Sequence, residues 1–314
     1  MKPSGQKTLA ARTEICGKGV HSNSPVRLIL APAEANSGIV FHRSGLESVI
    51  TRKIPALWSS VCMTELCTVI GDIKLGYVST IEHLMSALLA LGIDNLSIEI
   101  DGPEVPILDG SAVEFVRLID QIGLVESSAR RRYVKVLKPV RIEHGRGFSE
   151  LRPATQGFHL DVEIDFSAPV IGRQRKVVEL SPQIFREEIQ GARTFGFMRD
   201  VEHLWKAGFA LGSSLENSVA LDGDKILNPE GLRYKDEFVR HKMLDAIGDL
   251  SLAGAPIIGT YRSYCGGHKM NFLVLEALFA DPAAFAYVET PFPETAARRT
   301  MPVVAGQSAI ARAS

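Results

Sequence analysis

The chain has 314 residues, of which 46% are hydrophobic and 23% are charged, with a formal net charge of -1. This length suits roughly two domains, each with its own hydrophobic core. A near-neutral charge argues against a general nucleic-acid binder, which would carry a basic excess, but it allows one anionic ligand held by a few local cations.

The cysteines, the N-terminus and the hydropathy pattern bear on the compartment. The four cysteines form no C-x-x-C pair, so we expect neither a disulfide framework nor a structural zinc knuckle. They are Cys16, Cys62, Cys67 and Cys265. No apolar segment follows the basic residues 1–7, and no window approaches the about 18 apolar residues of a membrane helix. We expect a cytoplasmic protein without stable membrane insertion.

Residues 1–127 have the pattern of a first α+β domain. Turn residues separate short apolar runs that predict strands at 26–30, 38–41, 66–70, 77–78 and 95–100. Helices are predicted over 81–92 and 112–122, the first with Ser79 or Thr80 as a hydroxyl N-cap and with Gly92 as its end. In residues 17–22, two glycines lie close to His21, which predicts a hairpin turn or, alternatively, a loop that approaches a ligand.

The second half repeats this order. The charged residues 128–132 are the expected linker, residues 133–295 the second α+β domain, and residues 296–314 a poorly ordered tail. Strands are predicted at 133–142, 158–166 and 257–264, and helices around 182–190, 201–207, 238–252 and 271–279. Both halves place strands first and paired helices later, as expected of a duplicated α+β unit.

The predicted helix at residues 238–250 carries a candidate metal site. His241 and Asp245 are four residues apart, so both side chains lie on one helix face. A nitrogen and an oxygen donor suit zinc, and iron(II) is the alternative. Two ligands do not make a site, and a hydrogen-bonded pair on a helix surface is the other interpretation.

Further candidate residues occur near glycines and at the start of a helix. Glu82 and His83 begin an almost wholly apolar helix, where they need partners or water, although a capping carboxylate and a core histidine would also explain them. Residues 193–200 mix aromatic, hydroxyl and charged side chains as a ligand-lining loop does, while Phe195 could equally be a core residue. His268 follows two glycines and is a third candidate acid–base group.

Several blocks of sequence occur together in a distinctive order. The long ones are residues 79–84 (STIEHL), 192–200 (ARTFGFMRD), 238–250 (FVRHKMLDAIGDL) and 267–268 (GH). The short ones are residues 19–21 (GVH), 92–95 (GIDN) and 106–111 (PILDGS). With these blocks the chain closely resembles the UDP-3-O-acyl-N-acetylglucosamine deacetylase family over about residues 8–290.

The resemblance implies both a fold and a reaction. The implied fold is α+β, with two similar domains forming a β-α-α-β sandwich in which the helices pack between two sheets. The implied enzyme is a zinc-dependent amide hydrolase. It removes the N-acetyl group of UDP-3-O-acyl-N-acetylglucosamine, giving UDP-3-O-acyl-glucosamine and acetate, early in lipid A biosynthesis in the bacterial cytoplasm.

The resemblance also implies roles for individual residues. The ligands of Zn2+, or of Fe2+, would be His83, His241 and Asp245. Glu82 would be the general base, and Thr194 would hydrogen-bond the oxyanion. Protonated His268 would supply a proton to the leaving amine, with Asp249 keeping its pKa high.

Substrate contacts follow from the same resemblance. The expected contacts to the acylated UDP-sugar are Lys242, Phe195, Asp200, His21 and Leu66, with residues 201–220 forming an apolar passage for the acyl chain. The chain departs from its relatives at Cys265 and near Gly147, where a lysine is common. Arg146 or Arg262 is the expected replacement at the pyrophosphate.

Two other functions remain open from the sequence. One is the same metal chemistry on another acylated amine, because catalytic residues specify amide hydrolysis better than they specify a substrate. The other is a nucleotide- or RNA-binding module with structural histidines. We expect no nucleic-acid partner, and since nothing in the sequence demands a dimer we expect a monomer.

Overall fold

The computed structural model describes residues 4–44 and 51–290. The expectation of a poorly ordered tail at residues 296–314 therefore lies outside the described residues. So do the last residues of the expected second domain.

The N-terminal half builds a five-stranded sheet in the order β2-β3-β9-β4-β5, and a small three-stranded sheet from β6, β7 and β8. The strands are β1 (Gly5–Leu9), β2 (Thr13–Lys18), β3 (Pro25–Pro32), β4 (Ile39–Arg43), β5 (Arg52–Pro55), β6 (Val61–Met63), β7 (Val69–Asp72), β8 (Gly76–Val78) and β9 (Leu96–Ile100). The helices are η1 (Trp58–Ser60), α1 (Glu82–Leu91) and α2 (Val113–Ile122).

The C-terminal half builds a larger sheet around β19, which pairs with β11, β13 and β14, and a second small sheet from β16, β17 and β18. Its strands are β11 (Arg132–Val136), β12 (Val140–His144), β13 (Gly147–Arg152), β14 (Phe158–Asp165), β15 (Arg173–Glu179), β16 (Phe195–Phe197), β17 (Val219–Asp222), β18 (Lys225–Ile226), β19 (Ile257–Tyr264) and β20 (Phe285–Glu289). Its helices are α3 (Pro182–Ile184), the π-helical turn η2 (Phe185–Ile189), α4 (Met198–Lys206), α5 (Glu237–Leu250), η3 (Ser251–Ala253) and α6 (His268–Ala280).

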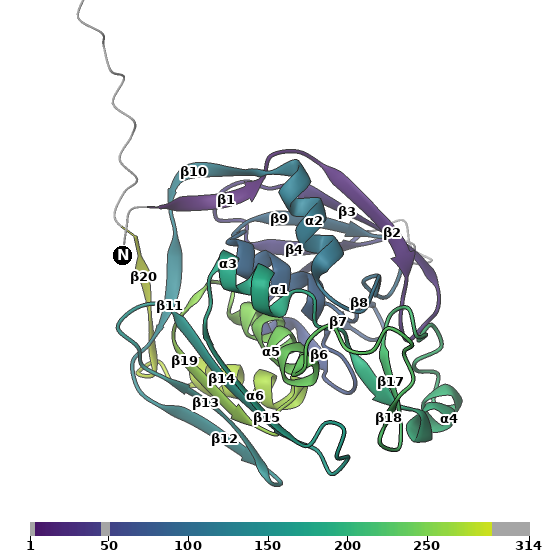
Figure 1. The fold of residues 1–314 in the computed structure, drawn as a ribbon. Helices are drawn as coiled ribbons and strands as arrows, with labels where there is room; N and C mark the ends of the chain where they lie inside the picture. The colour runs from purple at the N-terminus through teal and green to yellow at the C-terminus, as the bar shows by residue number, and fades with distance from the viewer. Residues whose placement is uncertain (1–3, 45–50, 291–314) are drawn as a thin grey trace, which may run out of the picture.

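The helices lie between the two large sheets. Figure 1 shows α1 and α5 side by side in the middle of the molecule, with the N-terminal sheet on one side and the C-terminal sheet on the other. Nearly every residue of α1 is buried, as expected for a helix covered on both faces. The predicted α+β sandwich, with helices packed between two sheets, is confirmed.

The start of α1 differs from the prediction, whereas its end does not. Ile81, not a hydroxyl residue, occupies the N-cap position, because Thr80 Oγ1 donates to Glu104 and Ser79 Oγ to the carbonyl of Pro103. These side chains anchor the preceding segment instead of the helix. Gly92 ends the helix with a φ of 79°, a left-handed conformation that glycine adopts without strain.

Two other boundaries differ from expectation. Regular structure reaches into both ends of residues 128–132, the expected linker, because β10 (Leu124–Arg130) pairs with β1 and β11 begins at Arg132. Between these strands Arg131 pairs with Asp94 at 2.8 Å, which holds the segment against the body. α6 begins three residues earlier than predicted, so His268 lies in its first turn and not in a loop. The division into two domains stays a prediction.

The contact between α1 and α5 generates a stability prediction. A Cβ on Gly248 of α5 would collide with the backbone of Glu82 on α1. We expect Gly248→Ala to lower the free energy of unfolding by about 1–3 kcal/mol, because overpacking outweighs the better helix propensity of alanine. Urea denaturation measures this change.

Gly196→Ala is the matched control, because no atom of a described residue other than its chain neighbours lies within 4 Å of the position where its Cβ would stand. It should change the free energy of unfolding by less than about 0.5 kcal/mol. A Gly248→Ala protein as stable as wild type would show that the two helices can separate at no cost.

Candidate metal centre and active site

Packing of α1 against α5 brings His83, His241 and Asp245 together. The Nε2 atom of His83 lies 3.6 Å from Asp245 Oδ1, and the Nε2 atom of His241 lies 3.4 Å from the same oxygen. The two imidazole rings meet edge to face, with centroids 5.0 Å apart. All three side chains are buried, and their ligand atoms lie within 4.8 Å of one another. The structure thus adds His83 to the pair that helical spacing alone had placed on one face.

The donors of this triad fit a divalent cation. His241 Nδ1 lies 3.1 Å from the carbonyl oxygen of Ala192, so Nδ1 carries the proton and the lone pair of Nε2 faces the centre. Asp245 Oδ1 is buried and has no hydrogen-bond partner among the described residues. Two imidazole nitrogens and one carboxylate oxygen suit zinc or iron(II), and three protein ligands are the number found in catalytic sites.

The protonation states favour metal binding as well. Burial lowers the pKa of His241 to about 3, which keeps its imidazole neutral. Burial would raise the pKa of Asp245, but the neighbouring His241 and Lys242 hold it well below its usual value. Lys242 Nζ donates to Asp245 Oδ2 at 2.7 Å. The residue that we expected at the sugar is therefore in contact with a candidate metal ligand.

Glu82 lies beside this triad at the start of α1. One carboxylate oxygen accepts a hydrogen bond of 3.1 Å from the backbone N–H of Thr68, and the other lies 3.9 Å from His268 Nε2. Burial raises the pKa of Glu82, while the charges of His268 and His83 oppose that rise. A buried carboxylate with few hydrogen-bond donors is a suitable proton acceptor.

Asp249 and His268 form a second acid–base pair. His268 Nδ1 donates to Asp249 Oδ2 at 2.9 Å, from α6 to α5. Burial alone would lower the pKa of His268, but Asp249, Glu82 and Asp245 together raise it to about 9. At neutral pH the imidazole is therefore protonated, with Nε2 directed toward Glu82. Asp249 lies on the same helix as His241, as the eight-residue spacing predicted.

Sequence reasoning missed three residues that hold these groups, or the loop around His21, in place. Thr68 binds both carboxylates, through its N–H to Glu82 and its hydroxyl to Asp249. Asn271 Nδ2 donates to Asp249 Oδ2 at 2.8 Å. The spacing of His268 and Asn271, three residues apart, was the signal that could have revealed this contact. The third, Glu104, binds the loop around His21.

Phe195 lies beside His241 on a segment that a buried ion pair fixes, and Thr194 precedes it in the chain. Thr194 donates its N–H to the carbonyl of Gly110 at 2.8 Å, and its hydroxyl makes no hydrogen bond with a described residue. The ring of Phe195 lies 6.2 Å from that of His241 and 5.9 Å from Lys242 Nζ. The hydroxyl and the aromatic ring are therefore available to a ligand.

The remaining expected substrate residues lie further out. The backbone N–H of His21 donates to the buried Glu104 at 3.0 Å, and its ring packs on Phe209 at 5.4 Å; burial lowers its pKa. Asp200 is exposed on α4, and Leu66 is 45% exposed with a φ of 65°. No contact among the described residues joins Asp200 or Leu66 to the triad.

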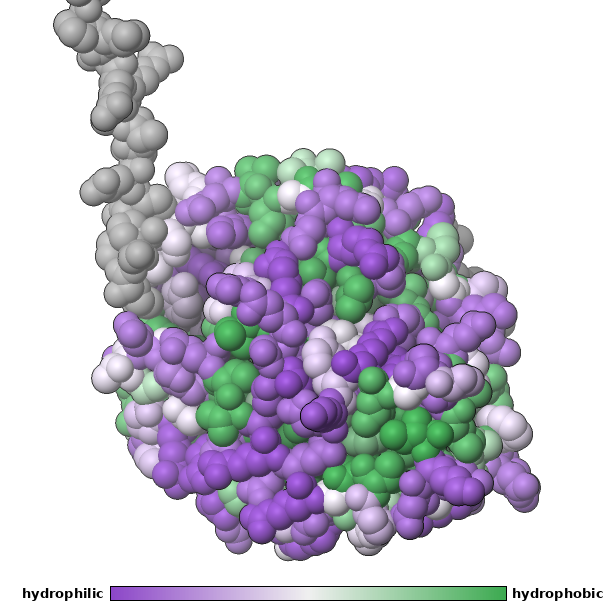
Figure 2. Space-filling view, in the orientation of Figure 1, coloured by the Kyte–Doolittle hydropathy of each residue, from purple (hydrophilic) through white to green (hydrophobic). Residues whose placement is uncertain are grey.

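The segment expected to form the acyl passage presents apolar surface. Figure 2 shows hydrophobic residues gathered over the region of β17, β18 and α4. Leu204 and Phe209 are half-buried, and large hydrophobic side chains nearby in sequence are exposed. These are Met198, Trp205, Leu211, Leu215 and Leu227.

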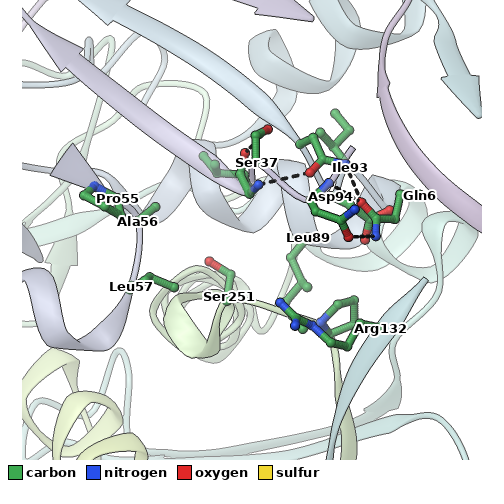
Figure 3. Close-up of a pocket in the computed structure, with 17 residues that line it drawn as sticks. Gln6, Ser37, Pro55, Ala56, Leu57, Leu89, Ile93, Asp94, Arg132 and Ser251 are labelled. Carbon is green, nitrogen blue, oxygen red and sulfur yellow. Dashed lines mark hydrogen bonds between the residues drawn. The ribbon is translucent and has the colours of Figure 1, made fainter. Parts of the chain in front are cut away.

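A separate cavity of about 250 Å³ lies near the opposite end of α1. Figure 3 shows Leu89 and Ser251 beside it, with Gln6 and Asp94 on its polar side. None of the catalytic candidates lines this cavity, so it is distinct from the candidate metal centre.

The fold and the cluster together define the class of the protein: an enzyme, and a hydrolase that acts on amides. The family model described as LpxC, UDP-3-O-acyl N-acetylglycosamine deacetylase, matches residues 6–280, and the chain belongs to this family.

Similar proteins include those of Brucella ovis, Brucella abortus and Brucella melitensis, each named UDP-3-O-acyl-N-acetylglucosamine deacetylase. Each is 48% identical over 285 residues, which is 90% of this chain and 98% of the relative. The chain is therefore a hydrolase, and the alternative hypothesis of a nucleotide- or RNA-binding module is wrong.

Across residues 4–44 and 51–290, no helix is both long enough and apolar enough to cross a bilayer.

The two arginines expected near the pyrophosphate are already paired, Arg146 with Asp165 at 3.5 Å and Arg262 with Asp161 at 3.2 Å. Cys265 has a φ of 48°, in the left-handed region.

The buried ion pair behind Thr194 generates a second prediction. Glu237 is fully buried and accepts hydrogen bonds from the backbone and guanidinium of Arg193, whose side chain is 2% exposed. We expect Glu237→Gln to lower the free energy of unfolding by about 3 kcal/mol, because the buried guanidinium loses its buried charged partner and keeps only the exposed Glu230. Urea denaturation of the purified protein tests this.

Glu230→Gln is the matched control, because Glu230 also pairs with Arg193 but its side chain is 55% exposed. An exposed pair contributes only about 0–1 kcal/mol, so this variant should be close to wild type. Equal losses in the two variants would contradict the importance of burial.

Proposed function

We propose that the protein catalyses zinc-dependent hydrolysis of the N-acetyl group of UDP-3-O-acyl-N-acetylglucosamine, giving UDP-3-O-acyl-glucosamine and acetate, an early committed step of lipid A biosynthesis. The observation that carries the proposal is the buried His83, His241 and Asp245 triad beside Glu82 and His268 in a member of this family. Iron(II) is the alternative metal, because the same donors suit it.

The proposed chemistry uses the residues as they lie. A divalent cation bound by the triad would polarise the acetyl carbonyl and lower the pKa of water to about 7. The carboxylate of Glu82 accepts the proton of the attacking water, and the hydroxyl of Thr194 donates to the oxygen that becomes negative. His268 donates a proton from Nε2 to the leaving amine, while Asp249 holds Nδ1. Acetate and the free amine are the products.

The proposed substrate contacts surround this centre. Phe195 and Lys242 lie nearest to it, so they would meet the sugar, and His21, Asp200 and Leu66 would bind groups further out. The apolar surface between Met198 and Leu227 would receive the acyl chain. Burial of each chain methylene would contribute about 0.8 kcal/mol.

We also propose that the enzyme acts in the cytoplasm as a monomer. All four cysteines are free thiols, in keeping with a reducing compartment. Fractionation of cells that produce the protein tests the compartment. Sedimentation analysis of the purified protein tests the monomer, which a stable dimer would contradict.

Metal content and turnover should fall together when a metal ligand is removed. We expect wild type to hold about one zinc per chain and to deacetylate UDP-3-O-acyl-N-acetylglucosamine, and His241→Ala to lose both. Elemental analysis and acetate release, measured on the same preparations, check this. Iron in place of zinc would identify the alternative metal.

His159→Ala is the control, because His159 lies on β14, away from the triad, and should keep both metal and activity. Metal without deacetylation of this substrate would point to another acylated amine. Activity on an acylated sugar that lacks the UDP group would do the same. Turnover by metal-free wild type would contradict the mechanism.

The raised pKa of His268 sets the alkaline limit of activity. Since Nε2 must carry a proton to donate, kcat should hold at lower pH and fall as pH rises through about 9. Asp249→Asn removes the charge that raises this pKa, so the alkaline fall should move to lower pH. Steady-state kinetics between pH 6 and 10 measure both limits.

Asp281→Asn is the control, because Asp281 pairs with Lys138 on the surface and should leave the limit unchanged. An alkaline limit that stays in place in Asp249→Asn would rule out His268 as its origin.

A further inference from the structure

A chain of buried polar side chains continues from the active site into the C-terminal sheet. Asn271 Nδ2 donates to Asp249 Oδ2 at 2.8 Å, and Asn271 Oδ1 accepts from the hydroxyl of Tyr261. The hydroxyl of Ser149 lies 3.0 Å from that of Tyr261. Asn271 is 2% exposed, and Tyr261 and Ser149 are fully buried. None of these three residues has a part in the proposed mechanism.

The polarity of this chain is fixed at its active-site end. An ionised carboxylate can only accept, so the amide nitrogen of Asn271 must face Asp249 and its oxygen must face Tyr261. Tyr261 must then donate to Asn271, and Ser149 is left to donate to Tyr261. Burial raises the pKa of Tyr261 to about 12, which keeps its hydroxyl protonated for this bond. The bonds from Tyr261 through Asn271 to Asp249 therefore all run in one direction.

The chain reaches the carboxylate oxygen that holds the catalytic imidazole. His268 and Asn271 are three residues apart in the first turn of α6, so they lie on one helix face. Both donate to Asp249 Oδ2, His268 at 2.9 Å and Asn271 at 2.8 Å. Thr68 holds the other carboxylate oxygen, Oδ1, so Asn271 is the residue that fixes Oδ2, the atom to which the imidazole donates.

We propose that Asn271, oriented by Tyr261, is a positioning residue that fixes Asp249 and through it the Nε2 atom of His268. This inference rests on the proposed function, in which His268 donates a proton to the leaving amine. It assigns the polar chain a role in the reaction and not only in the stability of the sheet. If His268 is displaced by a fraction of an ångström, it transfers its proton less efficiently. Loss of Asn271 should therefore lower kcat.

The test is a kinetic comparison of Asn271→Leu, Tyr261→Phe and Ser149→Ala with wild type. Leucine has a similar volume but no donor, and we expect it to lower kcat roughly ten- to hundredfold, the range for losing an outer hydrogen-bond partner of an active-site group. Tyr261→Phe should lower kcat several-fold and Ser149→Ala less, because their effects pass through Asn271. KM and zinc content should stay near wild type in all three.

A double-mutant cycle separates positioning from general stability. If Asn271 acts through His268, Asn271→Leu should cost little further activity in a His268→Gln background. Equal fold-losses in both backgrounds, or a loss of zinc or rise in KM that accounts for the effect, would overturn the proposal. So would a Tyr261→Phe enzyme with wild-type kcat.

Two controls keep the outcome clear. Glu276→Gln, on the exposed face of α6, should be as active as wild type. If Asn271→Leu fails to fold, Tyr261→Phe tests the proposal instead, because it removes only one oxygen atom. It is then compared in the wild-type and His268→Gln backgrounds. Wild type without deacetylase activity would defeat the proposed function, whereas an active wild type with unaffected variants would defeat only the role of Asn271.

Discussion

The structure depends on the close contact between α1 and α5. Gly248 lets the backbone of α5 approach that of Glu82, and apolar side chains such as Leu84 and Leu244 surround the contact. Neither helix carries a complete metal site. His83 reaches the pair on α5 only because no side chain separates the two helices at this point. The hydrophobic packing of the sandwich is therefore what assembles the polar centre.

That centre buries three carboxylates, which would be costly without partners. Asp245 accepts a hydrogen bond from Lys242 and lies beside the two imidazoles. Asp249 accepts hydrogen bonds from His268 and from the neutral side chains of Asn271 and Thr68. Glu82 has a single backbone donor, and its pKa is raised where that of Asp245 is lowered. The unequal partners fit the two proposed tasks, a carboxylate that stays ionised as a ligand and one that accepts a proton.

Much of this arrangement could be predicted from the sequence. Helical spacing placed His241, Asp245 and Asp249 on one face, and the family blocks supplied His83, Glu82 and His268 as their partners. The class of fold followed from the order of strands and helices and from the resemblance. Local propensity failed where tertiary contacts decide, as at Thr80, whose hydroxyl binds Glu104 and not the helix start. It also gave no sign of β10 (Leu124–Arg130), which pairs with β1.

The residues that escaped prediction are those that hold others in place, and they come from both halves of the molecule. Thr68 reaches Asp249 from the small N-terminal sheet, and Asn271 reaches it from the side of the C-terminal sheet. Thr68 has no recognisable spacing to the groups that it supports, because its contacts exist only after the halves have packed, whereas Asn271 lies three residues after His268. Asp249 is thereby fixed from two directions, which gives His268 one orientation before any substrate arrives. The expected outer contacts Leu66 and Asp200 are exposed and make no such bonds to the centre among the described residues, so hydrogen bonding concentrates on the buried acid–base groups.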